Sequence, residues 1–220
     1  MGKDGQSGGI EKVSMKEEAR RAKGRPRLKS AAKEIAYLAL SVALLSVCAW
    51  ITIPFGAIPV TLQTFAVALI GALLGTVRGT LAVLIYFVMG LIGIPVFSGF
   101  HAGVVALLGP TGGYLIGFVF EVAITGLFAA IRVKNKIVET ALTFLGALLA
   151  LAALYFFGTL WFITVYNRGG AEPIGIAAAL MLCVVPYILP DSIKVLLASV
   201  LSVRLKPYLK FNKKHTKKPA

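Results

Sequence analysis

The chain has 220 residues, 58% of them hydrophobic, and its mean hydropathy is +0.85. A soluble domain is usually about 45–50% apolar, so the composition excludes an ordinary soluble globular domain and indicates an integral membrane protein. The net charge of +14 could suggest a nucleic-acid-binding protein, but 21 of the 23 Lys and Arg residues lie in residues 1–33, at position 78, and in residues 132–136 and 204–220. Basic residues gathered between apolar segments are typical of the positive-inside rule, so we expect no nucleic-acid partner.

Six apolar segments of suitable length predict an all-α protein with six transmembrane helices. The fifth segment is long enough to require tilt or emergence from the bilayer. The last region contains Pro186 and Pro190, and proline removes a backbone donor. We therefore expect a short apolar half-segment followed by a helix that starts near Pro190. The predicted segments are 34–53, 60–75, 79–94, 111–131, 139–166 and 173–205.

The alternation of basic and uncharged loops predicts that both termini are cytoplasmic. With six spans, every basic cluster falls on the same side of the membrane, whereas four spans would put one on the wrong side. Residues 1–33 are polar and rich in Gly, Ser and charge, so we expect a mostly disordered tail. The predicted organisation is thus a tail over 1–33, a membrane domain over 34–205 and a second basic tail over 206–220. Both tails are expected to attract anionic lipid headgroups.

Motifs of the common catalytic classes are missing from the chain. It contains no GxxxxGK[ST] phosphate loop, no HExxH and no GxSxG. The two histidines, His101 and His215, cannot form a zinc site by themselves. We therefore expect no metal, no cofactor and no energy source within this chain. The Gly- and Pro-rich outer loops 54–60 and 95–114 are either ordinary turns or a lid over a pocket.

Three ionisable residues interrupt the apolar segments: Glu121, Asp191 and Lys194. Asp191 and Lys194 are three residues apart, which places them on one helix face. Each ion costs roughly 2.5–3.5 kcal/mol on insertion scales, so such residues are functional candidates by default. Asp191 follows Pro190, and at a helix start its carboxylate would suit the free backbone amides. For the Asp191–Lys194 pair, the alternative is an idle pair that only reduces the insertion cost. Glu121 is a partner to Lys194, a proton acceptor, a group facing a polar channel or a residue that lies against a partner protein.

Several segments, in order, resemble the biotin-specific substrate-binding subunit (S component) of energy-coupling-factor (ECF) transporters, the BioY family. The resemblance covers about Ile35 to Leu205. It implies a six-helix protein of the cell membrane that binds its vitamin on the outer side and has no enzymatic activity. It also implies a transmembrane T component and two cytosolic ATPases as partners. The matching segments are ITIPFGAIPVTLQTFAVALIGALLG, GLIGIPVFSG, GPTGGYLIGF, GTLWF and PYILPDSIK.

The resemblance also implies roles for individual residues. The family's Asp-x-x-Lys falls on Asp191 and Lys194, which we assign to the biotin ureido N–H groups and to the valerate carboxylate, respectively. Small residues four apart on the first helix, Ala39 and Ala43, match the positions that S components use to meet the T component. A gapless alignment places His101 where some members have an asparagine facing the ureido group. The remaining candidate substrate-binding residues in the matching segments are Gln63, Gly112, Gly113 and Tyr114.

Two positions depart from the family pattern. Some members carry Arg directly after the Tyr of the GPTGGY motif, where this chain has Leu115, so carboxylate binding would depend more on Lys194. Glu121 matches nothing in the pattern. Alternative functions are an S component for another small vitamin, a small integral membrane enzyme that uses Asp191, Glu121 or His101, and a structural subunit that binds no small molecule.

Overall fold

The computed structural model of the protein describes residues 31–56, 58–169 and 173–209. These residues belong to two compact units, and nearly all of them lie in the unit Leu38–Lys210. The expectations for the tail 1–33 fall almost entirely outside the described residues, as do those for the second tail beyond residue 209. The described helical residues nevertheless begin at Ala31, three residues before the predicted start of the first span.

The described chain is almost entirely helical, as predicted. The first helix (Ala31–Trp50) leads into two short antiparallel strands, in which Thr52 pairs with Thr61 and Ile53 with Val60. The remaining elements follow in chain order. They are β1 (Thr52–Ile53), β2 (Val60–Thr61), α2 (Gln63–Leu91), η1 (Ser98–Phe100), α3 (Val104–Leu108), α4 (Gly112–Ala129), α5 (Lys136–Arg168), α6 (Ile176–Cys183), α7 (Val185–Leu205) and η2 (Lys206–Tyr208).

Among the described residues, four helices are long and apolar enough to cross a membrane, or five if the bent pair of α6 and the following helix is counted as one span. This count differs from the six predicted spans because the segments 60–75 and 79–94 form one helical element, α2. Its backbone leaves helical geometry only at Gly75, with φ of 77° and ψ of 176°. Glycine adopts such positive φ values without the steric cost that other residues incur.

Hydrogen bonding shows that the two arms of α2 run back along each other. In a straight helix, Gln63 and Tyr86 would be roughly 35 Å apart, at about 1.5 Å per residue. Instead, the Gln63 side-chain amide donates to the Tyr86 hydroxyl at 3.0 Å. A methyl group built on Gly79 would also lie 3.3 Å from the Cα atom of Gly71. Gly75 is therefore the turn of a helical hairpin, and it lies where the predicted segment 60–75 ends.

The last predicted region is broken at a different residue from the one expected. The bend of 43° lies between α6 and α7, where Val184 has φ of −125° and ψ of −57°. Pro186 lies in the first turn of α7, where the missing N–H costs little. Pro190 is accommodated inside α7. Asp191 thus lies within the helix, and the prediction that it caps a helix start was wrong.

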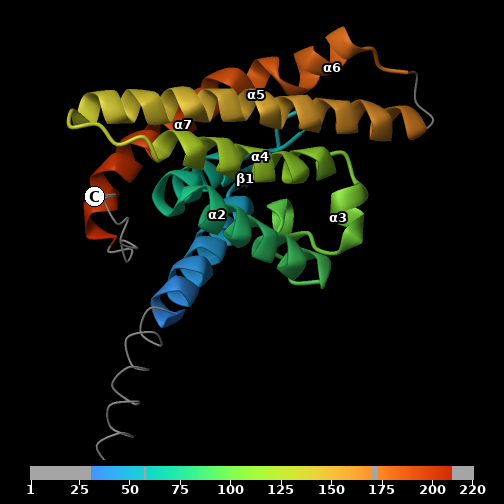
Figure 1. Cartoon of the computed structure of the whole chain (residues 1–220). Helices are drawn as coiled ribbons and strands as arrows, with labels where there is room; N and C mark the ends of the chain where they lie inside the picture. The colour runs from blue at the N-terminus through green and yellow to red at the C-terminus, as the bar shows by residue number, and fades with distance from the viewer. Residues whose placement is uncertain (1–30, 57, 170–172, 210–220) are drawn as a thin grey trace, which may run out of the picture. The chain divides into compact units, whose positions relative to one another are not determined.

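Helix α4 lies between α2 and α5 and packs closely against both. Figure 1 shows α4 and α5 side by side along much of their length, joined by a short connection. Glycines permit this close approach. A methyl group on Gly71 of α2 would lie 2.5 Å from the carbonyl oxygen of Val122, and one on Gly117 of α4 would lie 2.7 Å from the Leu154 side chain of α5.

A buried polar cluster ties the C-terminal end of α4 to α5 and to η2. The Lys206 ammonium donates to the Ala129 carbonyl at 2.8 Å and pairs with Glu139 at 3.4 Å. Arg132 approaches the same carboxylate at 3.7 Å. Lys206 is only 6% exposed. The packed part of the chain therefore includes Lys206, which the sequence placed at the start of the second tail.

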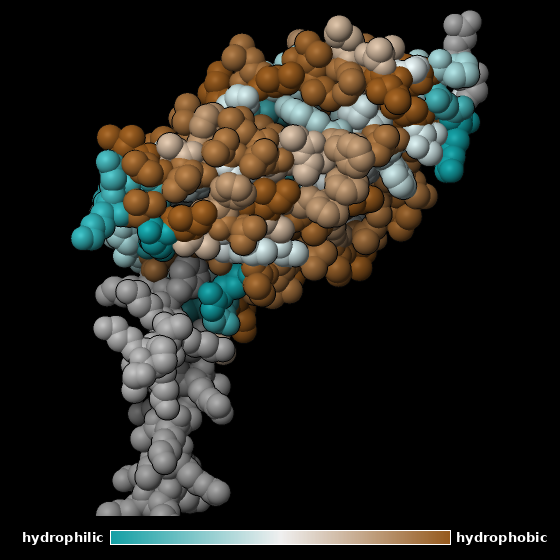
Figure 2. Space-filling view, turned by 45° about the horizontal axis from the view of Figure 1, so that its top comes forward, coloured by the Kyte–Doolittle hydropathy of each residue, from teal (hydrophilic) through white to brown (hydrophobic). Residues whose placement is uncertain are grey.

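The outer surface is strongly apolar. Figure 2 shows a face on which hydrophobic side chains predominate. Large hydrophobic residues are exposed on several helices, among them Leu40, Leu81, Leu127 and Leu189, at 68%, 45%, 63% and 71%. A soluble monomer rarely exposes so continuous an apolar surface. The described helices therefore present the surface expected of a multi-pass membrane protein.

Candidate functional site

A cavity of about 400 Å³ lies among β2, the N-terminal ends of α2 and α4, the loop 95–111, α5 and the α6–α7 region. Its size suits a small organic molecule. Most of the lining surface is apolar, although half of the 24 lining residues carry a polar or ionisable group. The polar and ionisable residues that line it are Thr61, Gln63, Thr64, Ser98, His101, Thr111, Tyr114, Tyr155, Cys183, Tyr187, Asp191 and Lys194.

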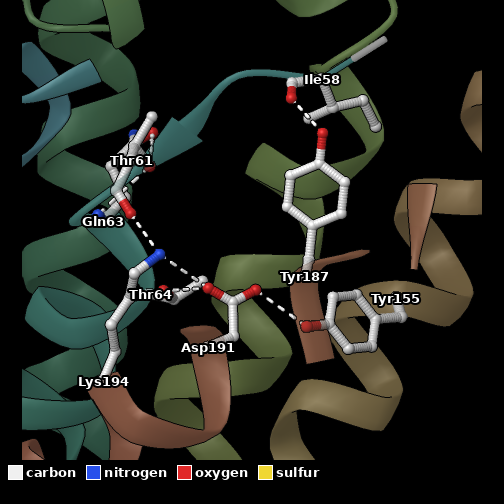
Figure 3. Close-up of polar contacts among 8 residues, drawn as sticks. All are labelled: Ile58, Thr61, Gln63, Thr64, Tyr155, Tyr187, Asp191 and Lys194. Carbon is white, nitrogen blue, oxygen red and sulfur yellow. Dashed lines mark hydrogen bonds and ion pairs between the residues drawn. The ribbon is translucent and has the colours of Figure 1, made fainter. Parts of the chain in front are cut away.

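The structure brings Asp191 and Lys194 together in the wall of this cavity. The Lys194 ammonium lies 2.8 Å from Asp191 Oδ1 and also donates to the Thr61 carbonyl at 2.6 Å (Figure 3). The side chain of Asp191 is only 7% exposed and that of Lys194 only 12%. Buried ions require such partners because desolvation is costly. The pair is therefore a fixed, charged feature in a cavity whose lining surface is mostly apolar.

Two further hydroxyl groups hold the Asp191 carboxylate. Thr64 of α2 donates to Oδ1 at 3.1 Å, and Tyr155 of α5 donates to Oδ2 at 2.8 Å. Figure 3 shows Thr64, Tyr155 and Lys194 converging on the Asp191 carboxylate from α2, α5 and α7, respectively. Neither Thr64 nor Tyr155 was predicted from the sequence. The polar start of the second span gave a signal for Thr64, but nothing separates Tyr155 from the other aromatic residues of its helix.

Tyr187 is a third site residue that was not predicted from the sequence. Its hydroxyl donates to the carbonyl groups of Ile58 and Phe55, which belong to the connection between β1 and β2. Its ring also lines the cavity (Figure 3). Because Tyr187 lies one turn before Asp191 on α7, the same helix supplies the polar pair and anchors the first outer loop.

Three other predicted residues also line the cavity. Gln63 donates to Tyr86, whose hydroxyl in turn donates to the Val96 carbonyl at the base of the second outer loop. The Tyr114 hydroxyl donates to the Cys183 carbonyl at 3.2 Å, next to the break between α6 and α7. The exposed His101 ring contacts the Ser98 carbonyl through Nδ1 at 2.6 Å. Because a carbonyl only accepts, this contact places the proton on Nδ1.

Gly112 and Gly113 do not line the cavity, although they were predicted to contact the substrate. A methyl group on Gly112 would lie 1.6 Å from the Leu107 carbonyl oxygen. One on Gly113 would lie 2.2 Å from Cβ of Trp161. The structure therefore gives both glycines a packing role at the start of α4.

Glu121 is fully buried in α4 at 0% exposure, outside the cavity lining. Neither carboxylate oxygen has a hydrogen-bond partner among the described residues. Lys194 makes its polar contacts with Asp191 and Thr61 instead. The alternative in which Glu121 forms a direct pair with Lys194 does not occur in this structure.

Comparison with known proteins gives consistent results. The model of the BioY family matches residues 16–211. The chain is 40% identical over 174 residues to the probable biotin transporter BioY of Pyrococcus horikoshii, covering 79% of this chain and 96% of that protein. It is 37% identical over 164 residues to the biotin transporter BioY of Thermotoga maritima, covering 74% and 90%. The crystal structure of the S component for biotin from an ECF-type ABC transporter superimposes with a TM-score of 0.69 at 28% identity, covering 81% and 93%.

Proposed function

Because the chain belongs to the BioY family, we propose that it is the biotin-binding S component of an ECF-type ABC transporter. It is a multi-pass membrane protein that binds its substrate and leaves ATP hydrolysis to partner subunits. Biotin is proposed as the substrate because the relatives named above are biotin transporters, and the transporter class is that of the superimposed structure. The observation that carries the proposal is the apolar cavity of about 400 Å³ with one buried ion pair in its wall.

The geometry of the ion pair changes the assignment made from the sequence. Asp191 and Lys194 were assigned to opposite ends of biotin, but their charged atoms are 2.8 Å apart. The ureido ring of biotin is separated from its carboxylate by a second ring and a four-carbon chain, which is a much greater distance. While the pair stays in contact, both residues must act at the same end of the ligand.

The ureido group is the end that suits this pair. A carboxylate ligand placed beside Asp191 would meet a like charge, whereas a ureido group is neutral and carries both donors and an acceptor. Asp191 then accepts from a ureido N–H group, and Lys194 donates to the ureido carbonyl. We place the biotin carboxylate toward Ser98 and His101, two of the polar residues of the second outer loop that line the cavity.

Six membrane crossings, with both termini in the cytoplasm, fit this function. The two arms of α2 count as separate crossings because Gly75 turns the chain back. With the first helix, α4, α5 and the bent α6–α7 pair, the total is six. The basic residues at 1–33, 78, 132–136 and 204–220 then share one side of the membrane. In this arrangement the basic tails, which lie mostly outside the described residues, face anionic lipids.

The proposed partners are a transmembrane T component and two cytosolic ATPases. Ala39 and Ala43 are exposed on the first helix, four residues apart, so a partner helix could approach the backbone closely there. Replacing either alanine with tryptophan is expected to abolish biotin uptake by cells that contain all the subunits, while biotin binding by the purified protein stays unchanged. Uptake of labelled biotin and co-purification of the T component measure this effect.

A matched control for these substitutions is Ala178→Trp, which places the same bulk at an exposed alanine of α6. Uptake is expected to survive this change. Normal uptake by both Ala39→Trp and Ala43→Trp would exclude this face as the docking surface.

Titration of the purified protein with labelled biotin tests the proposed function directly. We expect a single site with sub-micromolar affinity and no conversion of biotin to another product. Failure to bind biotin, together with tight binding of another vitamin, would favour an S component of different specificity. Turnover of a lipid or peptide would favour the enzyme alternative.

A further inference from the structure

The Asp191 carboxylate has little hydrogen-bonding capacity left for a ligand. Lys194 and Thr64 both donate to Oδ1, at 2.8 Å and 3.1 Å, and Tyr155 donates to Oδ2 at 2.8 Å. A carboxylate offers about four acceptor sites, two on each oxygen. Oδ1 is therefore fully used, and Oδ2 can accept one more hydrogen bond.

Lys194 is restricted in the same way. Its ammonium group has three N–H donors. One is used by Asp191 Oδ1 and a second by the Thr61 carbonyl at 2.6 Å. The wall of the cavity thus presents one free acceptor on Asp191 next to one free donor on Lys194 (Figure 3).

We propose that Tyr155 and Thr64 are positioning residues that limit the Asp191–Lys194 pair to this one acceptor and one donor, and so to one edge of the ureido ring. Such an edge consists of one N–H group beside the carbonyl oxygen. Only one of the two ureido nitrogens of biotin then donates to Asp191. This inference rests on the proposed function, since it names the part of biotin that the pair recognises.

The placement of Tyr155 explains how this restriction is maintained. Asp191 belongs to α7, and its carboxylate is held by Thr64 of α2 and Tyr155 of α5, so hydroxyl groups from two other helices fix its orientation. Asp191 is 5% exposed and Thr64 is 8% exposed, which leaves water little access to replace a lost hydroxyl group. Without the Tyr155 hydroxyl, Oδ2 would have two free sites and the carboxylate could turn about its own axis.

Two isosteric analogues of biotin test the proposal. Each is a cyclic carbamate in which oxygen replaces one of the two ureido N–H groups without adding bulk. The wild-type protein is expected to bind one analogue at least about 30-fold more weakly than the other, because only one position faces Asp191 Oδ2. In Tyr155→Phe, biotin binding should weaken about tenfold, and the difference between the two analogues should shrink to about threefold.

Controls separate positioning from simple stability. Tyr166→Phe removes a hydroxyl from an exposed ring on the same helix, where it packs against Phe162, and should leave the analogue ratio intact. Thr64→Val frees a site on Oδ1 and should also reduce the ratio, whereas Thr64→Ser retains the donor and should keep it. If Tyr155→Phe does not fold, the ratio of the affinities of Thr64→Val for the two analogues tests the proposal instead.

The outcomes are distinct. If the wild-type protein binds biotin but does not distinguish the two analogues, both nitrogens reach Asp191 equally and the inference is wrong. An unchanged ratio in folded Tyr155→Phe and Thr64→Val would overturn it as well. If the wild-type protein does not bind biotin at all, the proposed function itself fails.

Discussion

Replacement of Lys194 with methionine is expected to weaken biotin binding by about 100-fold. The substitution keeps most of the side-chain length but removes the donor proposed for the ureido carbonyl. Hydrogen bonds to charged groups contribute about 1.5–3 kcal/mol, and 1.4 kcal/mol corresponds to tenfold in affinity. The change also leaves the buried Asp191 carboxylate with two neutral donors, Thr64 and Tyr155, and no cation. Titration of the purified protein with labelled biotin measures the effect.

Asp191→Asn is expected to weaken binding by a smaller factor, about 30-fold, because the amide retains one acceptor oxygen. Glu139→Gln is the matched control, since Glu139 belongs to a buried ion pair that does not line the cavity. Its affinity for biotin should stay within about twofold of the wild type. Wild-type affinity in either Lys194→Met or Asp191→Asn would show that the pair does not bind the substrate.

The second large effect is expected for Gly113→Ala, which should destabilise the protein without any ligand present. The new methyl group would lie 2.2 Å from Cβ of Trp161 and 2.7 Å from the Phe157 carbonyl oxygen. The Phe157 carbonyl oxygen is part of the α5 backbone, and Cβ of Trp161 is bonded directly to it. Neither clash can therefore be relieved by a rotamer change. Overpacking of this kind costs about 3 kcal/mol when the helices must separate. The apparent melting temperature should fall by about 5–10 °C.

A matched control for Gly113→Ala is Gly175→Ala, because nothing lies within 4 Å of a methyl group at Gly175. Its melting temperature should be unchanged. Thermal unfolding without biotin distinguishes the two roles considered for Gly113. If Gly113→Ala melts like the wild type yet binds biotin poorly, Gly113 serves the ligand as the sequence suggested, and the packing role is wrong.

Packing and substrate binding are closely linked at the N-terminal end of α4. The Trp161 indole N–H donates to the Gly109 carbonyl at 3.0 Å, and Gly109 lines the cavity. Trp161 is also the residue that Gly113 contacts. The second outer loop is thus fixed to α5 at the point where α4 begins. This link explains why the GPTGGY segment can matter for binding although its two middle glycines do not line the cavity.

The hydropathy of the sequence determined the membrane class and the approximate extent of several helices. The predicted segments 111–131 and 139–166 correspond to α4 (Gly112–Ala129) and α5 (Lys136–Arg168). These agree because long apolar runs between charged loops have few alternative structures in a membrane. Asp191 and Lys194 also stood out from sequence alone, since charged side chains are costly among apolar neighbours.

Local breaks in the helices were harder to predict than their presence. Pro190 was expected to start the last helix, but the chain breaks at Val184 and accommodates Pro190 inside α7. Gly75 was expected near a turn between two spans, and the structure makes it the turn of a hairpin within α2. In each case several residues could have formed the break, and packing between helices selected one of them.

Only the tertiary structure decided which groups surround the ion pair. Thr64 and Tyr155 lie 127 and 36 residues from Asp191 in the chain, yet both donate to its carboxylate. Hydroxyl side chains are frequent in this sequence, and no spacing rule distinguishes these two from the others. Their role depends on how α2, α5 and α7 pack, since a hydrogen bond forms only within about 3 Å. The i,i+3 spacing already puts Asp191 beside Lys194 on α7, and the packing of the helices places both charges in the wall of the cavity.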